Sequence, residues 1–264
     1  FTAYCYEKIK QGLPNAKLKD SERLVNWTRL VKSNEEIKLM KSAALISEKG
    51  MKTAMETINP GVRQCDLVAK ILEAGTSGIN GSGGDLPALC PLVMAGEAAA
   101  TAHPMWTDIP FEKNQTVALE LGGAHKRYNA GLARTFQLGS GPQKVYDTAN
   151  AVTEGLESVL ATVRPGVTAG DVHTAWQKVL NRYGLVKESR IGYGIGVGYS
   201  PDWGEHTISL RANDLTVLEK NMTLHVMLGM WMDGWGIEFS ETVAVTDSGV
   251  DCLTDFPRSV IDVR

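Results

Sequence analysis

Several features that mark common protein classes are missing from this sequence. Its four cysteines lie far apart without a Cys-x-x-Cys pair, which indicates reduced thiols of a cytosolic protein. No run reaches the roughly 18 apolar residues that a membrane helix needs. The chain has 27 basic and 30 acidic residues, so its net charge of −3 provides no basic field for nucleic acid. We therefore expect a cytoplasmic protein whose partner is a small molecule, with no nucleic acid and no membrane.

Familiar catalytic signatures are absent too. The sequence contains no phosphate-binding loop, no His-Glu-x-x-His motif and no Gly-x-Ser-x-Gly nucleophile elbow. The glycine-rich segment Gly192–Gly198 includes Gly-x-Gly, but it does not link a clear strand to a helix. A dinucleotide site is therefore not expected there. The chain begins at Phe1 without a signal-peptide pattern, and we expect an earlier domain to precede it.

What is present centres on the stretch Phe111–Gly139, which predicts two β-strands with a turn. Thr116–Leu121 alternates β-branched and apolar residues, Gly122-Gly123 interrupts the run, and Tyr128–Leu138 resumes it. Glu120 lies inside the apolar first strand. A buried ionised carboxylate costs several kcal/mol unless it is paired or used, so this position needs a functional explanation.

Two landmarks of the sequence occur twice. Pro60-Gly61-Val62 is repeated as Pro165-Gly166-Val167, and Glu112-Lys113-Asn114 as Glu219-Lys220-Asn221, at nearly the same offset. Each Pro-Gly-Val precedes an amphipathic segment, and each Glu-Lys-Asn precedes a hairpin pattern. Matching order and spacing predict an internal duplication, in which two hairpins lie side by side with a cleft between them.

Helical and strand patterns alternate along the rest of the chain. Ser33 to Glu36 is a capping box that opens a long helix to about Ile58. The other expected helices are 4–13, 64–75, 142–163 and 169–183, and the other expected strands are 16–25, 91–96, 192–198 and a second hairpin over 222–246. Helices and antiparallel hairpins in duplicate predict an α+β fold.

In this order, the elements resemble the C-terminal domain of the creatinase/aminopeptidase P family, which has the pita-bread fold. The resemblance covers about Ser33 to Val250. It implies two pseudo-symmetric helix and antiparallel-hairpin halves around a curved sheet. Residues 1–32 are similar to the tail of a truncated N-terminal domain with its linker, and residues 33–264 to the catalytic domain. Relatives form homodimers, so the resemblance also implies a homodimer.

Metallopeptidases of this family bind two metal ions with five ligands: Asp, Asp, His, Glu and Glu. The resemblance places these ligands, in order, at Glu120, Gly131, Tyr193, Met227 and Ser240. Four of these positions lack a ligand side chain of the expected kind. Divalent cations need several anionic oxygens around them, so the resemblance implies neither a catalytic metal nor another cofactor.

Within the family, the local sequence is most similar to ectoine hydrolases. The supporting segments are NWTRLVKSNEEI, GGDLPALCPLVMAG, GYSPDWGEHTISLR and GMWMDGWGIEFSET. The resemblance implies a metal-independent hydrolase that opens the cyclic amidine of ectoine by C–N hydrolysis to acetyl-diaminobutyrate. Three alternatives stay open: a creatinase-like amidinohydrolase, an Xaa-Pro aminopeptidase or dipeptidase-like metallopeptidase, and a non-catalytic binding descendant.

Three residues are candidates for catalysis. Without a metal a side chain must act as base, and enclosure in an apolar strand would raise the pKa of Glu120 into a useful range. His103 aligns with a proton-handling histidine of creatinase-like members. Glu238 and Glu241 face opposite sides of the last strand, and we prefer Glu241 because it adjoins the lost ligand position.

Four residues are candidates for substrate binding: Tyr193, Trp203, Glu205 and His206. Tyr193 replaces the ligand histidine and can donate a hydrogen bond to a tetrahedral oxyanion. Trp203 belongs to an expected aromatic wall against a planar cation. Glu205 and His206 follow it in the sequence, and packing remains the alternative for His206. For Arg134, a structural role in the hairpin is favoured over a carboxylate clamp.

Overall fold

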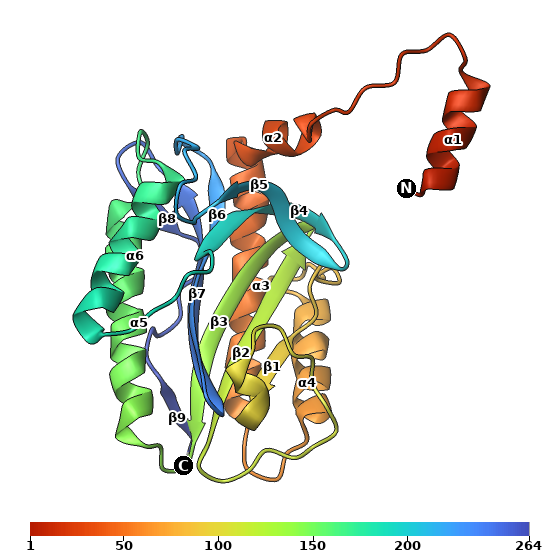
Figure 1. Cartoon of the computed structure of the whole chain (residues 1–264). Helices are drawn as coiled ribbons and strands as arrows, with labels where there is room; N and C mark the ends of the chain where they lie inside the picture. The colour runs from red at the N-terminus through yellow and green to blue at the C-terminus, as the bar shows by residue number, and fades with distance from the viewer. Residues whose placement is uncertain (264) are drawn as a thin grey trace.

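The computed structural model describes residues 1–263, in which nine β-strands form one curved sheet with helices packed against it (Figure 1). The helices are α1 (Ala3–Gly12), α2 (Leu24–Leu30), α3 (Asn34–Thr57), α4 (Gln64–Ser77), α5 (Gln143–Thr162) and α6 (Ala169–Tyr183), with a 3-10 turn η1 (Gly96–Ala100). The strands are β1 (Leu92–Ala95), β2 (Gln115–His125), β3 (Tyr128–Leu138), β4 (Gly192–Tyr199), β5 (Asp202–Ser209), β6 (Thr223–Met232), β7 (Trp235–Val245), β8 (Val250–Cys252) and β9 (Ile261–Val263). The strand order is β1-β2-β3-β4-β6-β7-β8, with β5 on β4 and β9 on β3. The expected α+β class is confirmed.

The predicted capping box starts helix α3. Ser33 Oγ accepts from the Glu36 backbone N–H, and the Glu36 carboxylate accepts from the Ser33 N–H. Further along α3, Ser47 Oγ accepts from Gly123 N on β2 and donates to Ala130 O on β3, both at 2.7 Å. One helical side chain thus fixes α3 against both strands of the first hairpin.

The sequence had suggested that the two glycines of this hairpin interrupt the strand, but they do not. Strand β2 continues through them to His125, and the turn lies at Lys126 and Arg127, which both have positive φ. A Cβ at Gly123 would lie 2.3 Å from the Ala43 carbonyl oxygen. The missing side chain is what allows α3 to lie directly on β2.

The two halves of the chain repeat the same backbone contacts. In the first half, Gly61 N donates to Phe111 O at 2.8 Å, and in the second Gly166 N donates to Leu218 O at 2.9 Å. Both glycines have left-handed φ values, 91° and 86°. The internal duplication expected from the sequence is therefore present in the fold, with α3 and α4 against β2 and β3 and with α5 and α6 covering β6 and β7.

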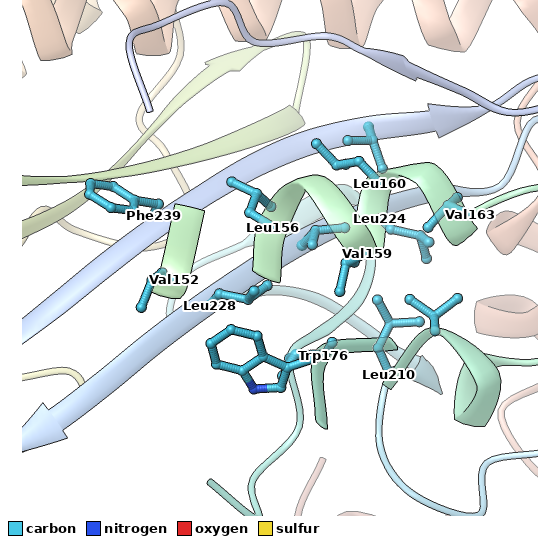
Figure 2. Packing of buried hydrophobic residues seen from close by; sticks show 14 of the residues in the cluster. Val152, Leu156, Val159, Leu160, Val163, Trp176, Leu210, Leu224, Leu228 and Phe239 are labelled. Atoms are coloured by element: carbon cyan, nitrogen blue, oxygen red, sulfur yellow. The ribbon is translucent and has the colours of Figure 1, made fainter. Parts of the chain in front are cut away.

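The largest apolar cluster fills the second half. Figure 2 shows one face of α5 directed at β6, β7 and α6. Trp176 of α6 lies among these residues and is fully buried, and a Cβ at Gly155 of α5 would lie 2.0 Å from its ring. The apolar residues labelled in Figure 2 are Val152, Leu156, Val159, Leu160, Val163, Trp176, Leu210, Leu224, Leu228 and Phe239. This cluster gives the second hairpin a rigid backing.

The two hairpins lie side by side, and side chains join their facing strands. Thr242 Oγ1 of β7 accepts from Gly131 N at 2.9 Å, and Ser240 Oγ accepts from Ala133 N at 2.7 Å. Thr135 of β3 bonds in turn to the backbone of Glu238. This seam between β3 and β7 places the polar residues of both hairpins close together.

The N-terminal segment differs most from expectation. Residues 16–25 were expected to form a strand, but they lack regular structure up to α2, which begins at Leu24. The apolar Leu24 and Val25 are exposed, and no neighbouring strand takes up residues 16–25. Helix α1 buries none of its residues and stands apart from the sheet (Figure 1). Arg264, the last residue of the expected catalytic domain, lies outside the described residues.

No helix within residues 1–263 has both the length and the apolar character needed to cross a membrane.

Candidate functional site

Glu120 lies in the middle of β2 with its side chain 1% exposed. Within residues 1–263, neither of its carboxylate oxygens has a hydrogen-bond partner. Burial raises the pKa of this carboxyl to about 7. A carboxylate that the fold leaves unpaired in the interior is a group available for chemistry near neutral pH.

Glu238 of β7 is a second buried carboxylate of the same kind. It is fully buried, and within residues 1–263 both of its oxygens lack a hydrogen-bond partner. Burial raises its pKa well above the ordinary value, the charge of Glu120 raises it further, and the charge of Lys187 opposes the rise. Two buried acids that influence each other's ionisation titrate as a pair.

Glu241, the preferred catalytic acid of the last strand, does not join this pair. Its Oε1 accepts from Arg134 Nη2 at 2.6 Å and from Arg258 Nε at 2.9 Å, and its Oε2 accepts from the Thr254 hydroxyl. Because side chains alternate along β7, Glu238 and Glu241 point to opposite faces, as expected. Glu241, the residue preferred from the sequence, is thus bound by two arginines, whereas Glu238 is the carboxyl of β7 on which the charge of Glu120 acts.

His225 of β6 completes the buried cluster, and the sequence reasoning missed it. Its Nε2 lies 2.8 Å from Ser240 Oγ, its Nδ1 lies 3.2 Å from the Tyr193 hydroxyl, and the same nitrogen lies 3.9 Å from Glu120 Oε1. Burial lowers the pKa of this imidazole to about 3, so it is neutral at physiological pH. Its sequence signal is the one that marks Glu120: a polar residue inside an apolar strand.

Tyr193 and Trp203 are brought to this cluster as expected. Trp203 Nε1 donates to the Tyr193 hydroxyl at 2.8 Å, and both rings meet His225 edge-on with centroids 5.6 Å apart. Burial, followed by the charge of Glu120, raises the pKa of Tyr193, so the hydroxyl keeps its proton. The two aromatic rings thus pack around the imidazole that adjoins Glu120.

This arrangement does not fit a two-metal centre. A Cβ at Gly131, where the resemblance places the second aspartate ligand, would lie 2.8 Å from the His225 ring and 3.1 Å from Trp203. The volume of that ligand is therefore occupied by other side chains. Within residues 1–263, no group of three or more His, Cys, Asp and Glu side chains is arranged to hold a metal ion.

His103 approaches Glu120 from the opposite side. Its Nε2 lies 3.8 Å from Glu120 Oε2, while its side chain is 51% exposed. It also lines a hollow of about 350 Å³ together with Met105 and Pro201. Partial burial, followed by the charge of Arg190, lowers its pKa. The imidazole thus lies between Glu120 and solvent, which is the position that proton exchange requires.

The other two expected binding residues lie elsewhere. Glu205 is paired with Lys32, whose Nζ donates to both carboxylate oxygens at 2.7 Å. Both side chains are almost completely buried. His206 is exposed and lies 3.1 Å from Asp202. Glu205 therefore anchors the segment before α3 to β5, and His206 belongs to the outer surface.

Lys187, on the loop after α6, was also missed. Its Nζ donates to Gly229 O at 2.5 Å and lies 5.6 Å from the centroid of the Trp231 ring. Burial lowers its pKa to about 8, and the charge of Glu238 opposes this. Loop lysines are common on surfaces, so the sequence alone gave no signal for this contact.

Comparisons with known proteins agree with this fold. Residues 38–247 match the model of metallopeptidase family M24. An uncharacterized hydrolase/peptidase, y4tM of Sinorhizobium fredii, is 43% identical over 99% of this chain and 67% of its own length. Ectoine hydrolase of Halomonas elongata is 38% identical over 98% of this chain and 67% of its own length. The chain thus spans about two thirds of these relatives.

A solved structure, the X-Pro aminopeptidase of Thermotoga maritima, superposes with a TM-score of 0.87 at 22% identity, covering 99% of this chain and 72% of that one. At this identity the likeness concerns the fold alone. Together with the family match and the two relatives, it shows that the chain belongs to metallopeptidase family M24, the pita-bread family of creatinase and aminopeptidase P, and is a hydrolase.

Proposed function

We propose that this chain is a metal-independent hydrolase that opens the cyclic amidine of ectoine at a C–N bond and releases acetyl-diaminobutyrate. The observation that carries the proposal is the pair of buried carboxyls, Glu120 and Glu238, which lack hydrogen-bond partners within residues 1–263. Glu120 Oε1 also lies 3.9 Å from Nδ1 of the neutral His225 imidazole. The relative named ectoine hydrolase supports the choice of substrate. The poor fit of the site to metal ions supports metal independence.

The charge of the pair matches the substrate. Glu120 loses its proton near pH 7, whereas Glu238 holds its own to higher pH. Above pH 7 the pair therefore carries about one negative charge. An amidinium carries one positive charge, so its binding compensates the burial of the carboxylate that the protein leaves unpaired.

The separation of the two pKa values assigns the roles of acid and base. Glu120 removes a proton from water as the water oxygen bonds to the amidine carbon. Glu238 then protonates the departing nitrogen as the C–N bond breaks, and it regains a proton from the hydroxyl of the collapsing intermediate. The proton held by Glu120 passes through His103 to the released amine. Tyr193 and Trp203, whose rings meet His225 beside Glu120, provide the aromatic surface for the substrate ring.

We expect the protein to convert ectoine to acetyl-diaminobutyrate at a rate unchanged by a chelator, because each step uses protein groups. Proton NMR of the acetyl methyl group measures the rate with and without EDTA. Creatine and an Xaa-Pro dipeptide, each assayed with and without added Mn²⁺, serve as comparison substrates. Loss of ectoine turnover in EDTA and its return with Mn²⁺ would contradict metal independence. Dipeptide cleavage alone would favour the metallopeptidase alternative.

For Glu238→Gln we expect kcat to fall about a hundredfold or more, because the departing nitrogen loses its proton donor. The rise of kcat/KM with pH, centred near 7, should remain, since it belongs to ionisation of Glu120. A pH–rate profile of the variant and the wild type checks both points. Disappearance of this rise in Glu238→Gln would mean that the two carboxyls have exchanged roles.

We also propose a cytoplasmic location for the protein. The four cysteines are free, which supports a reducing, cytoplasmic location. We further propose that residues 1–32 end a preceding domain and that the complete protein is a homodimer. Helix α1, with no buried residue of its own, supports this by offering a surface that only a further contact would cover.

A further inference from the structure

A substrate that carries a carboxylate needs a cationic partner at the site, and Arg134 does not provide one. Its Nη2 is bound to Glu241, and its remaining N–H groups donate to backbone carbonyls, including Ser240 O at 2.7 Å and Pro257 O at 2.6 Å. The side chain is fully buried in these contacts. Arg134 has a structural role, as the sequence suggested, so another residue must bind the carboxylate.

Arg190 has the properties that Arg134 lacks. It lies just before β4, and its guanidinium carbon is 4.5 Å from the centroid of the Tyr193 ring. Within residues 1–263 its side chain makes no hydrogen bond or ion pair. A guanidinium stacked on an aromatic ring is held in orientation while its N–H groups stay available to a ligand.

Among the arginines of the surrounding hollow, Arg190 is the one whose N–H groups are all available to a ligand. It lines a hollow of about 330 Å³ whose lining also includes Arg23, Arg211, Asp202, Asp214 and His206. The two aspartates accept from backbone N–H groups, Asp202 from Gly204 and Asp214 from Ser209 and Thr216. Arg23 donates to His206 O at 2.7 Å, and Arg211 donates to Ser209 Oγ at 2.9 Å. Each flanking arginine uses one nitrogen in these contacts, whereas Arg190 donates no side-chain hydrogen bond within residues 1–263.

The tyrosine connects this hollow to the buried acids. Arg190 covers the face of the Tyr193 ring, while the hydroxyl at the end of that ring lies 3.2 Å from His225 Nδ1, the nitrogen that is 3.9 Å from Glu120 Oε1. The charge of Arg190 also reaches His103, whose pKa it lowers after the effect of burial. A cationic ligand group beside Glu120 and an anionic ligand group at Arg190 would therefore lie at different parts of the same side chain, the first near the hydroxyl of Tyr193 and the second over its ring.

We propose that Arg190 binds the carboxylate of the substrate, so that the site selects compact zwitterions that join a delocalised cation to a carboxylate. This inference rests on the proposed function for the identity of both the cation and the carboxylate. Selectivity then comes from two opposite charges at a fixed spacing, the Glu120–Glu238 pair at one end and Arg190 at the other.

Two substrates that differ in one group test the assignment. Ectoine carries the carboxylate, and 2-methyl-1,4,5,6-tetrahydropyrimidine is the same amidine without it. In Arg190→Gln the KM for ectoine should rise about tenfold with little change in kcat, whereas the KM for the carboxylate-free amidine should stay constant. Arg190→Lys should restore part of the loss. Arg211→Gln, in the same hollow, is the matched control and should leave both KM values unchanged.

The outcomes separate this proposal from the proposed reaction. If Arg190→Gln weakens both amidines equally, or neither, Arg190 does not bind the carboxylate. If the wild type hydrolyses neither amidine, calorimetric binding of the same two compounds decides. If the wild type binds ectoine more tightly, and this preference is lost in Arg190→Gln and partly regained in Arg190→Lys, the carboxylate site stands and the proposed reaction is rejected. Equal binding of both compounds by the wild type overturns the assignment.

Discussion

Glu120→Gln is expected to reduce ectoine ring opening at least a thousandfold, the largest loss of activity that we expect from one substitution. The amide has nearly the same size, but it cannot accept a proton from water, and within residues 1–263 Glu120 is the one carboxylate that lies within 4.0 Å of His103. General bases contribute about a hundred to ten thousand times in rate. Single-turnover measurement of acetyl-diaminobutyrate formation gives the effect directly.

The same variant should be more stable than the wild type at alkaline pH. The pKa of Glu120 is raised by burial from 4.5 to about 7 in the folded protein, so folding favours its neutral form. The associated stability is complete below the pKa of the unfolded chain and is lost as pH rises through 7. The cost of ionising the buried wild-type carboxyl reaches about 3 kcal/mol at high pH, and glutamine avoids it.

Denaturant unfolding at pH 5 and pH 8.5 therefore provides the control for the activity loss. The difference in unfolding free energy between Glu120→Gln and the wild type should be small at pH 5 and should favour the variant at pH 8.5. A variant that is inactive and destabilised at both pH values would show that the carboxylate has a structural partner. Retained turnover would remove Glu120 from the mechanism.

Local sequence was enough to identify Glu120 because its signal is local. A charged residue in an alternating apolar strand conflicts with burial, and only pairing or use resolves the conflict. The duplication was also readable, since Pro60-Gly61 and Pro165-Gly166 fix the same turn and contacts in each half. The strand expected before α2 failed because its apolar residues meet no partner strand, a property of tertiary structure alone.

The composition of the rest of the site depends on contacts between the halves. Alternation along β7 shows that Glu238 and Glu241 point apart, but not which of them faces Glu120. That choice is set by the seam in which Ser240 of β7 accepts from Ala133 N of β3. Arg190 lies outside a strand and shows no periodic signal, so only its stacking on Tyr193 reveals it.

Glu241→Gln should destabilise the protein by about 3 to 5 kcal/mol, the largest expected loss of stability. This carboxylate and the Arg134 guanidinium are both fully buried and joined at 2.6 Å, and Arg134 also holds the backbone of the C-terminal segment through Phe256 O and Pro257 O. Removing one charge of a buried pair leaves the other uncompensated. The midpoint and slope of urea unfolding measure the loss.

Glu238→Gln is the matched variant for this test, because it lies three residues away on β7 and is equally buried. Its carboxylate has no partner within residues 1–263, so the free energy of unfolding should hold or rise while turnover falls. The two substitutions should therefore give opposite results: lost activity with an intact fold for Glu238, and lost stability for Glu241.

If Glu241→Gln unfolds at wild-type urea concentrations yet fails to turn over ectoine, the catalytic role first expected for Glu241 would return and Arg134 would need another counter-charge. Besides Glu241, the charges that act on Arg134 are those of the cationic Arg258 and the anionic Asp255.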